Sequence, residues 1–189
     1  MQPTSTQHLR LAAAHLRAGS VIAHATEGVW GLACNPFDAA AVRRVLALKS
    51  RPVEKGMILI CASLEQVMPL LEPLSADERE RITTPAKGPV TWLVPCRPGV
   101  PALLRGHHST LAIRITRHEQ SRALIEQCGL PLVSTSAKPA GRPPALTALR
   151  VRQYFRDSID YLLPGQLGGA AGPSEIRRLQ DGAVQRAGS

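Results

Sequence analysis

The sequence predicts a single α/β domain over residues 1–189, with a mixed sheet and flanking helices. Helical and strand patterns alternate along the chain, as is typical of α/β proteins. A length of 189 residues is sufficient for one sizeable hydrophobic core. With 44% hydrophobic and 20% charged residues, the composition is that of a globular protein.

The N-terminal part is predicted to contain two helices, each followed by a strand. Apolar residues at helical spacing define the helices, and short apolar runs define the strands. The helices end at Gly19 and near Lys49, and the strands cover residues 21–25 and 57–61. Asp38 is a suitable N-cap for the second helix. The basic loop that follows this helix therefore lies at the entrance to a strand.

Capping residues predict four further helix starts. In a capping box, a Ser or Thr and a Glu or Gln three positions later bond to each other's backbone N–H groups. The candidate boxes are Ser63 with Gln66, Ser75 with Glu78, and Thr116 with Glu119, the last opening a helix that closes at Gly129. Thr147 is an N-cap candidate for one more helix.

The remaining segments predict strands and turns. Residues 90–94, 111–115 and 132–136 have strand patterns. Glycine-rich residues 164–173 predict a mobile loop within the domain. The dipeptide Asp181-Gly182 predicts a tight hairpin near the C-terminus.

The chain is strongly basic, with a net charge of +9 and a pI near 10.3. Such a charge favours anionic partners, for example nucleotides or RNA, without choosing between them. Residues 1–10 lack the apolar core of a signal peptide, and no apolar run approaches the ~20 residues of a membrane span. We therefore expect a cytoplasmic protein that does not contact the membrane.

The cysteine and histidine spacing does not predict a metal site. The four cysteines are far apart and form no CxxC pair, so we expect buried thiols in a reducing compartment. The only histidine cluster is His107-His108, and adjacent side chains point apart on most backbones. We expect no resident metal ligands.

Two polar segments together indicate a polyphosphate site. Residues 49–56 (KSRPVEKG) set two lysines and an arginine around a proline, and residues 131–138 (PLVSTSAK) end an apolar strand in three hydroxyls. Point charges, a planar guanidinium and neutral donors are the groups that a triphosphate requires. Alone, the basic loop is more often a solvated surface, and residues 134–136 are also compatible with an ordinary strand end. Because neither GxxxxGK[ST] nor a GxGxxG after a strand is present, a P-loop or Rossmann site is not supported.

Six ordered segments resemble the YrdC-like threonylcarbamoyl-AMP synthases of bacteria. ATEGVWGL at 25–32 is similar to the family's PTE-x-V-[YFW]-G-L, KSRP at 49–52 to KxRP, and KGPVT at 87–91 to PGPVT. LAIRI at 111–115 is similar to AVRV, LVSTSA at 132–137 to LVSTSAN, and PSEIR at 173–177 to PS-x-I-R. The matches cover roughly residues 20–178.

The resemblance implies a twisted α/β fold with a concave basic face, and a specific reaction. L-Threonine, bicarbonate and ATP, with Mg²⁺ as the metal that accompanies ATP, would give threonylcarbamoyl-AMP and pyrophosphate. The product would serve tRNA threonylcarbamoyladenosine modification through a downstream threonylcarbamoyl-transferase complex, with tRNA or other RNA as a further partner. The carbamate nucleophile is already anionic, so positioning and charge neutralisation at the α-phosphate dominate the chemistry.

The resemblance also assigns roles to residues. Arg114 is expected to clamp the threonine carboxylate, with Thr26 and Trp30 lining the amino-acid pocket. The positions expected to act in catalysis are Lys49, Arg51 and Arg114. The positions expected to bind ATP are Lys49, Arg51, Lys55, Ser134, Ser136, Lys138, Ser174 and Arg177. Ser134 and Ser136 would donate to the nucleotide, and Ser174 and Arg177 would close over the adenylate as a lid.

Departures from the family pattern leave alternatives open. Lys138 stands where the family has Asn, which removes an amide oxygen that can face a metal or ribose. Ala25 replaces the usual Pro, and Gly172 stands where some relatives have Asn.

Arg114 has the alternative role of an internal ion pair with a carboxylate such as Glu27. A non-catalytic RNA-binding protein and a degenerate paralogue that binds nucleotide without reacting are the other functional hypotheses, although aromatic residues are only 3% of the chain.

Overall fold

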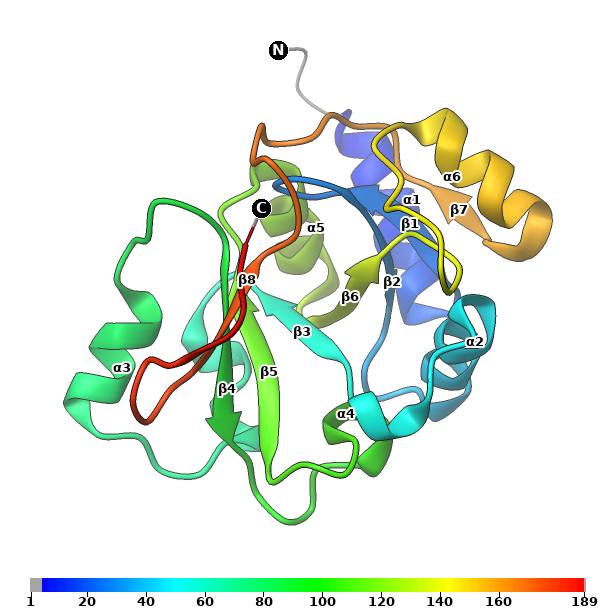
Figure 1. Ribbon diagram of the computed structural model, residues 1–189. Coiled ribbons are helices and arrows are strands. Elements are labelled where there is room, and N and C mark those ends of the chain that lie inside the picture. Colours follow the sequence, from blue (N-terminus) through cyan, green and yellow to red (C-terminus); the bar gives the residue numbers. More distant parts are fainter. Residues whose placement is uncertain (1–4, 189) are drawn as a thin grey trace.

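A single mixed sheet organises the computed structural model, which describes residues 5–188 (Figure 1). Nine strands within this span lie in the order β7-β1-β2-β6-β3-β5-β4-β8-β9. The strands are β1 (Ile22–Ala25), β2 (Trp30–Cys34), β3 (Ile58–Cys61), β4 (Val90–Pro95), β5 (Thr110–Ile115), β6 (Leu132–Ser136), β7 (Tyr161–Leu162), β8 (Glu175–Arg178) and β9 (Val184–Arg186). The α-helices are α1 (Thr6–Arg17), α2 (Ala39–Lys49), α3 (Ala76–Thr83), α4 (Ala102–Arg105), α5 (Glu119–Cys128) and α6 (Ala148–Phe155).

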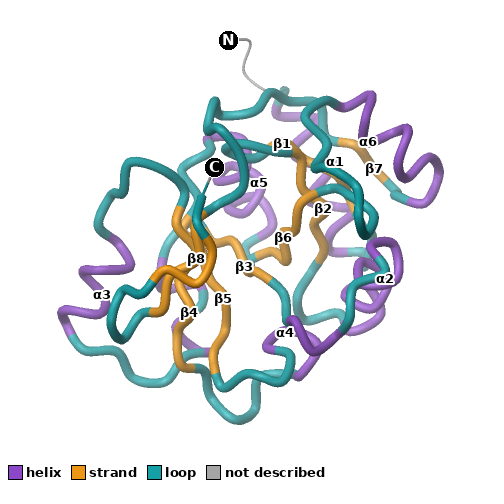
Figure 2. Tube along the Cα trace, in the orientation of Figure 1, coloured by secondary structure: helices purple, strands orange, loops and turns teal. Residues whose placement is uncertain are grey.

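Parallel and antiparallel pairs alternate irregularly across the sheet. The pairs β1–β2, β2–β6, β3–β6, β4–β5 and β8–β9 are antiparallel, and β1–β7, β3–β5 and β4–β8 are parallel. The C-terminal hairpin β8–β9 lies beside β4, although 79 residues separate β4 from β8 along the chain (Figure 2). The mixed α/β fold predicted from the sequence is confirmed.

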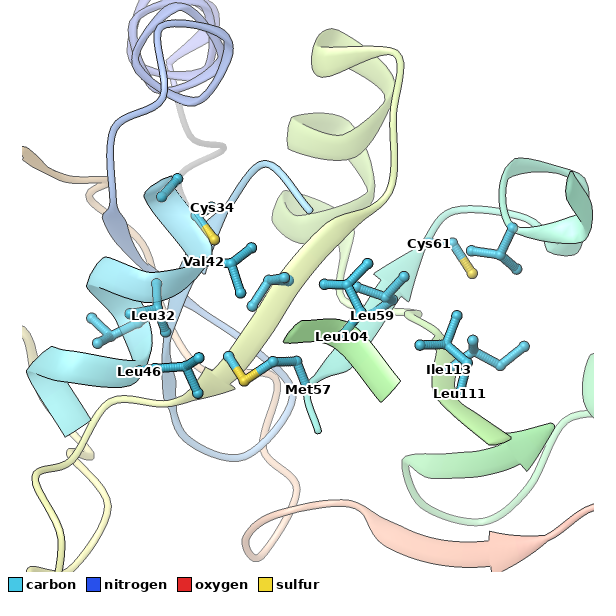
Figure 3. Close-up of a cluster of buried hydrophobic side chains, with 14 of the residues drawn as sticks. Leu32, Cys34, Val42, Leu46, Met57, Leu59, Cys61, Leu104, Leu111 and Ile113 are labelled. Carbon is cyan, nitrogen blue, oxygen red and sulfur yellow. The ribbon is translucent and has the colours of Figure 1, made fainter. Parts of the chain in front are cut away.

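The two faces of the sheet bury separate hydrophobic cores. On one face, α2 packs against β2, and the same core continues over β3 and β5 through side chains such as Leu32, Val42, Leu59 and Ile113 (Figure 3). On the other face, α1 and α5 pack together over a core that includes Ile60. Removing this apolar surface from water is the main stabilising contribution to the fold.

The helices α1 and α5 cover only part of their sheet face. Alternate residues of a strand point to the same face. On β6, Leu132 lies in the core under α1 and α5, whereas Ser134 and Ser136 on the same face line a cavity. On β3, Ile60 lies in that core and Ile58 lines the cavity. The uncovered part of the face is therefore where ligands can reach the sheet.

Most predicted elements are confirmed. The Ser75–Glu78 capping box forms with both hydrogen bonds, Asp38 caps α2, and Thr147 caps α6. Helix α5 ends at Gly129 in the left-handed conformation. The Asp181-Gly182 hairpin joins β8 to β9.

Two predicted capping boxes are wrong. Ser63 precedes a 3₁₀ turn without a side-chain cap, and Gln66 instead accepts a hydrogen bond from the backbone N–H of Ala62 at 2.8 Å. Helix α5 is capped by His118, because the Thr116 hydroxyl is bonded to Glu27 at 2.6 Å. In both places, a side chain expected to form the cap makes a hydrogen bond to a different partner.

Two strands of the sheet were missed in the sequence, whereas the burial of the cysteines was predicted. β2 and β7 were not predicted as strands. Cys34, Cys61, Cys96 and Cys128 are buried free thiols, as expected. Within residues 5–188 no helix is long and apolar enough to cross a membrane.

The basic loop, residues 49–56, is held against α4 and the turn that follows it. The Met57 N–H donates to the Leu104 carbonyl at 2.7 Å, and the His107 N–H donates to the Glu54 carbonyl at 3.2 Å. Gly106 has φ +66°, and a Cβ atom at this position would lie 2.2 Å from the Glu54 carbonyl oxygen. Only glycine therefore allows the two backbone segments to approach so closely.

We predict that Gly106→Ala destabilises the protein strongly. The backbone conformation of Gly106, φ +66° and ψ −141°, alone costs about 1–3 kcal/mol for a residue with a Cβ, and relieving the clash should add about 1–3 kcal/mol. Gly129→Ala is the control for a positive φ without crowding, because Gly129 has φ +73° and ψ 15° but open space around its Cβ position. Urea unfolding should show a larger loss of unfolding free energy for Gly106→Ala. Equal losses for the two variants would contradict the close packing of the basic loop.

Candidate functional site

A cavity of about 430 Å³ lies on the uncovered part of the sheet. Its floor is formed by strand residues, among them Gly31, Ile58, Ala112 and Ser136. Its walls are the loop after β1, the basic loop, the turn after β6 and the start of β8. Segments from both ends of the sequence thus converge on one site.

The cavity is strongly cationic. Its lining contains seven Lys and Arg residues, and Glu27 is the one carboxylate among the described lining residues. The seven are Lys49, Arg51, Lys55, Arg105, Arg114, Lys138 and Arg186. This composition favours a ligand with several negative charges.

Lys49, the last residue of α2, reaches across to the end of β6. Its Nζ donates to the backbone carbonyls of Ser136 and Lys138, the latter at 3.1 Å. Burial, with the nearby charges of Arg51 and Lys138, lowers the pKa of Lys49 to about 8. A nearby anion would favour the ammonium form and raise this pKa.

Arg51 stabilises the basic loop through hydrogen bonds to the loop's own backbone. Ser50 ends α2 in the left-handed conformation, which turns the chain so that Arg51 Nε and Nη2 donate to the Gly56 carbonyl at 3.1 and 2.9 Å. Burial and the charge of Arg186 lower the pKa of Arg51. Lys55 also lines the cavity. The loop therefore presents its cations on a fixed backbone.

Arg114 forms an ion pair with Glu27 at 3.4 Å, the alternative considered from the sequence. Burial alone would raise the pKa of Glu27, but Arg114 and the Thr116 hydrogen bond outweigh it, so the pKa lies below its usual value. Arg114 Nε is buried and makes no hydrogen bond within the described residues. Because Arg114 also lines the cavity, its guanidinium is suited to a ligand carboxylate.

Of the two residues expected around threonine, one lies at the cavity. Thr26 lines it and donates through its hydroxyl to the Val29 carbonyl at 2.7 Å. Trp30 lies in the core on the opposite face of β2, because the neighbouring Gly31 faces the cavity. This corrects the placement of Trp30 in the threonine pocket.

The hydroxyls and the lysine of the second segment lie together. Ser134, Ser136 and Lys138 all line the cavity. Ser134 Oγ lies 3.4 Å from Nε2 of the buried His24. The pairing of the 49–56 and 131–138 segments predicted from the sequence is confirmed by the Lys49 hydrogen bonds.

The C-terminal hairpin contributes a different arginine from the one expected. Ser174 lines the cavity and shares a hydrogen bond with Thr91 at 2.7 Å. Arg177 is directed away, where it pairs with Glu175 at 2.7 Å and lies over the Trp92 ring. Its assignment to the nucleotide site is therefore corrected.

Arg186 on β9 takes that place in the cavity. It lies opposite Ile176, a cavity residue, and its Nη2 donates to the Ser174 carbonyl at 2.7 Å. Burial and the charge of Arg114 lower its pKa. The Asp181-Gly182 turn was the only sequence signal that could have brought Arg186 back to the site.

Comparison with known proteins agrees with this geometry. The Sua5/YciO/YrdC family model, described as "Telomere recombination", matches residues 14–188. A threonylcarbamoyl-AMP synthase from Nitrosococcus oceani is 53% identical over 89% of this chain and 91% of its own. Another from Pseudomonas savastanoi pv. phaseolicola is 50% identical over 97% of this chain and 99% of its own.

A solved structure also resembles the whole described fold. The crystal structure of P. abyssi Sua5 complexed with L-threonine superposes with a TM-score of 0.91 at 28% identity, covering 99% of this chain. The chain spans 56% of that longer protein. The six sequence segments, the fold and the family model thus agree, and the chain belongs to the Sua5/YciO/YrdC family.

Proposed function

We propose that this protein is a threonylcarbamoyl-AMP synthase that forms threonylcarbamoyl-AMP and pyrophosphate from L-threonine, bicarbonate and ATP. The observation that carries the proposal is the cavity in which the basic loop, the β6 hydroxyls and Arg114 converge. Relatives about half identical over nearly the full chain bear the name of this enzyme. The cations suit the triphosphate, and Arg114 suits the amino-acid carboxylate.

The proposed chemistry needs no general base from the protein. The neutral threonine amine reacts with bicarbonate, by way of CO₂, to give a carbamate and one molecule of water, which carries away the amine proton and the bicarbonate OH. The anionic oxygen of the carbamate attacks the α-phosphorus of ATP. An O–P bond forms as the α–β bridging P–O bond breaks, and pyrophosphate leaves with the electron pair. Lys49, Arg51, Lys55 and Arg186 would neutralise the charge on the phosphates, and Arg114 with Thr26 would hold threonine in line.

Magnesium is proposed to enter as part of the substrate. Within residues 5–188 no group of three or more His, Cys, Asp or Glu side chains could hold a metal. The cavity carboxylate Glu27 is engaged by Arg114 and Thr116. Mg²⁺ usually binds through substrate phosphates and few protein ligands. We therefore assign Mg²⁺ to the phosphates of ATP, with no dedicated protein cage.

The product is proposed to pass to a threonylcarbamoyl-transferase complex that modifies tRNA.

Isothermal titration calorimetry with ATP and L-threonine, followed by an assay of pyrophosphate release with bicarbonate present, tests the enzymatic proposal. Synergistic binding and threonine-dependent pyrophosphate release are expected. Salt-sensitive RNA binding without affinity for either ligand would favour the RNA-binding alternative, and binding without pyrophosphate release would favour the degenerate paralogue.

We predict that Arg114→Lys impairs threonine use more than ATP use. Lysine keeps the charge but loses the planar fork, so the apparent KM for threonine should rise roughly tenfold or more. The KM for ATP, measured in the same steady-state assay, serves as the internal control. Equal increases in both constants would mean that Arg114 acts only through its ion pair with Glu27.

We predict that ATP binding is coupled to proton uptake by Lys49. In the free protein the pKa of Lys49 is about 8, so above this pH the amine is mostly neutral. Phosphates favour the ammonium form and raise the pKa, so binding near pH 9 should take up a fraction of a proton. Calorimetry in buffers of different ionisation enthalpy measures this uptake.

Two variants at the same position serve as controls for this prediction. Lys49→Arg carries a permanent charge and should bind ATP without proton uptake. Lys49→Met should also show none, and should bind ATP more weakly. Uptake that persists in both variants would assign the proton to another group.

We predict that Lys138→Asn makes the protein more dependent on Mg²⁺. Lys138 adds positive charge where Mg²⁺ would otherwise neutralise part of the phosphate charge. The amide of Asn can instead face a metal-bound water. Titrating Mg²⁺ in the pyrophosphate-release assay compares the two proteins. Identical titrations would mean that the Lys138 ammonium does not act on the phosphates, and complete loss of ATP binding would make it the principal phosphate ligand.

A further inference from the structure

A chain of polar groups, buried at Ser134, His24 and Ser121 and exposed at Gln166, connects the cavity wall to the Gly-rich segment. Ser134 contacts His24, which contacts Ser121 on α5, which contacts His118, which contacts the backbone of Gln166. Helix α5 lies against β1 (Figure 2), which brings Ser121 on the helix to His24 on the strand. Because some of these groups can only accept or only donate, the direction of each hydrogen bond can be worked out.

The outer end of the chain fixes the tautomer of His118. Its Nε2 lies 2.9 Å from the Gln166 carbonyl oxygen, which can only accept, so Nε2 carries a hydrogen. Its Nδ1 accepts from the Ser121 N–H at the start of α5. Neutral His118 therefore offers a lone pair at Nδ1.

Ser121 has one hydroxyl hydrogen, and the Ala25 carbonyl oxygen, which can only accept, lies 3.1 Å from its Oγ. His118 Nδ1 lies 3.0 Å from the same Oγ and already accepts from the Ser121 N–H. We place the hydroxyl hydrogen on the Ala25 carbonyl, so the lone pairs of Ser121 Oγ face His24 Nδ1 at 3.3 Å. In this arrangement His24 donates through Nδ1.

His24 is completely buried, and burial together with the nearby His118 lowers its pKa to about 3. The ring is therefore neutral and carries a single N–H hydrogen. With that hydrogen on Nδ1, Nε2 presents a lone pair towards Ser134 Oγ at 3.4 Å. The Ser134 hydroxyl donates into the protein, and its oxygen lone pairs are left for the cavity.

Gly31 keeps this contact open. It lies beside His24 in the β1–β2 register, and a Cβ atom on it would lie 3.1 Å from Ser134 Oγ and 3.3 Å from His24 Nε2. Any larger residue would crowd the space between the two groups. The absence of a side chain here is consistent with a requirement for the His24–Ser134 hydrogen bond.

We propose that His24 is a positioning residue that fixes Ser134 as a hydrogen-bond acceptor, so that this part of the cavity selects an N–H or O–H group of the bound amino acid. This inference rests on the proposed function for the identity of the ligand. It reverses the expectation that Ser134 donates to the nucleotide. L-Threonine offers two such donors, its amine and its side-chain hydroxyl.

The polarity is tested first in the unliganded wild-type protein. Long-range ¹H–¹⁵N NMR of ¹⁵N-histidine-labelled protein distinguishes the two imidazole tautomers, and the signal absent from a His24→Gln spectrum identifies His24 among the six histidines. We expect the Nδ1–H tautomer, unchanged between about pH 5 and 8, given the low pKa of His24. An Nε2–H tautomer or a charged ring would overturn the proposal. This result does not depend on whether threonine binds.

Ligand selection is tested by calorimetry with three compounds. L-α-Aminobutyrate lacks the threonine hydroxyl, and β-hydroxybutyrate lacks the amine. Ser134→Ala should weaken L-threonine about three- to tenfold, the range for one neutral hydrogen bond. The substitution should leave unchanged only the affinity for the analogue that lacks the recognised donor group. The analogue with unchanged affinity therefore identifies that group.

A matched variant separates positioning from packing. His24→Phe keeps a planar ring but frees the Ser134 hydroxyl, so it should reduce the preference for threonine over that analogue without changing affinity for the analogue itself. Equal weakening of all three compounds by either variant, or no weakening by Ser134→Ala, would overturn the proposal. Absence of threonine binding by the wild-type protein would instead reject the proposed function.

Discussion

The incomplete helical cover of one sheet face is the constraint on which the rest of the structure depends. Helices α1 and α5 bury the apolar ends of β3 and β6, and the same strands become polar where that cover stops. A fully covered face would leave Ser134, Ser136 and Arg114 buried without ligands, at a large desolvation cost. The position of these two helices thus decides which residues can do chemistry.

Backbone carbonyls, in place of carboxylates, hold several of the cavity cations. Lys49 bonds to Ser136 and Lys138, Arg51 to Gly56, and Arg186 to Ser174. A carbonyl fixes the position of a cation but does not neutralise it, so the positive potential persists. The lowered pKa values of Lys49, Arg51 and Arg186 result from burial and from this mutual repulsion. A bound polyanion would relieve the repulsion and stabilise the folded state.

Most helices and strands, and the meeting of the 49–56 and 131–138 segments, could be predicted from the sequence. Local signals, such as the caps at Asp38 and Ser75, were sufficient because they depend on neighbouring residues only. Thr116 failed as a cap because Glu27, far away in sequence, binds its hydroxyl. Sequence alone carries no information about such a competing partner.

The face on which a strand residue lies was the other source of error. Trp30 and Arg177 belong to segments that do reach the site, yet each side chain points to the opposite face from its neighbour in the cavity. A shift of one residue reverses every side chain of a strand. β2 could not be oriented without knowing that Gly31 faces Ser134, and Arg186 could not be found without the β8–β9 register.

The order of the strands has a consequence for biosynthesis. The cavity wall draws on residues from Thr26 to Arg186, and β9 at the sheet edge is its final component. During translation, which adds about 5–20 residues per second, the central strands and both cores can assemble while this wall is still incomplete. A nascent chain can therefore bury much of its apolar surface before Arg186 completes the set of cavity cations.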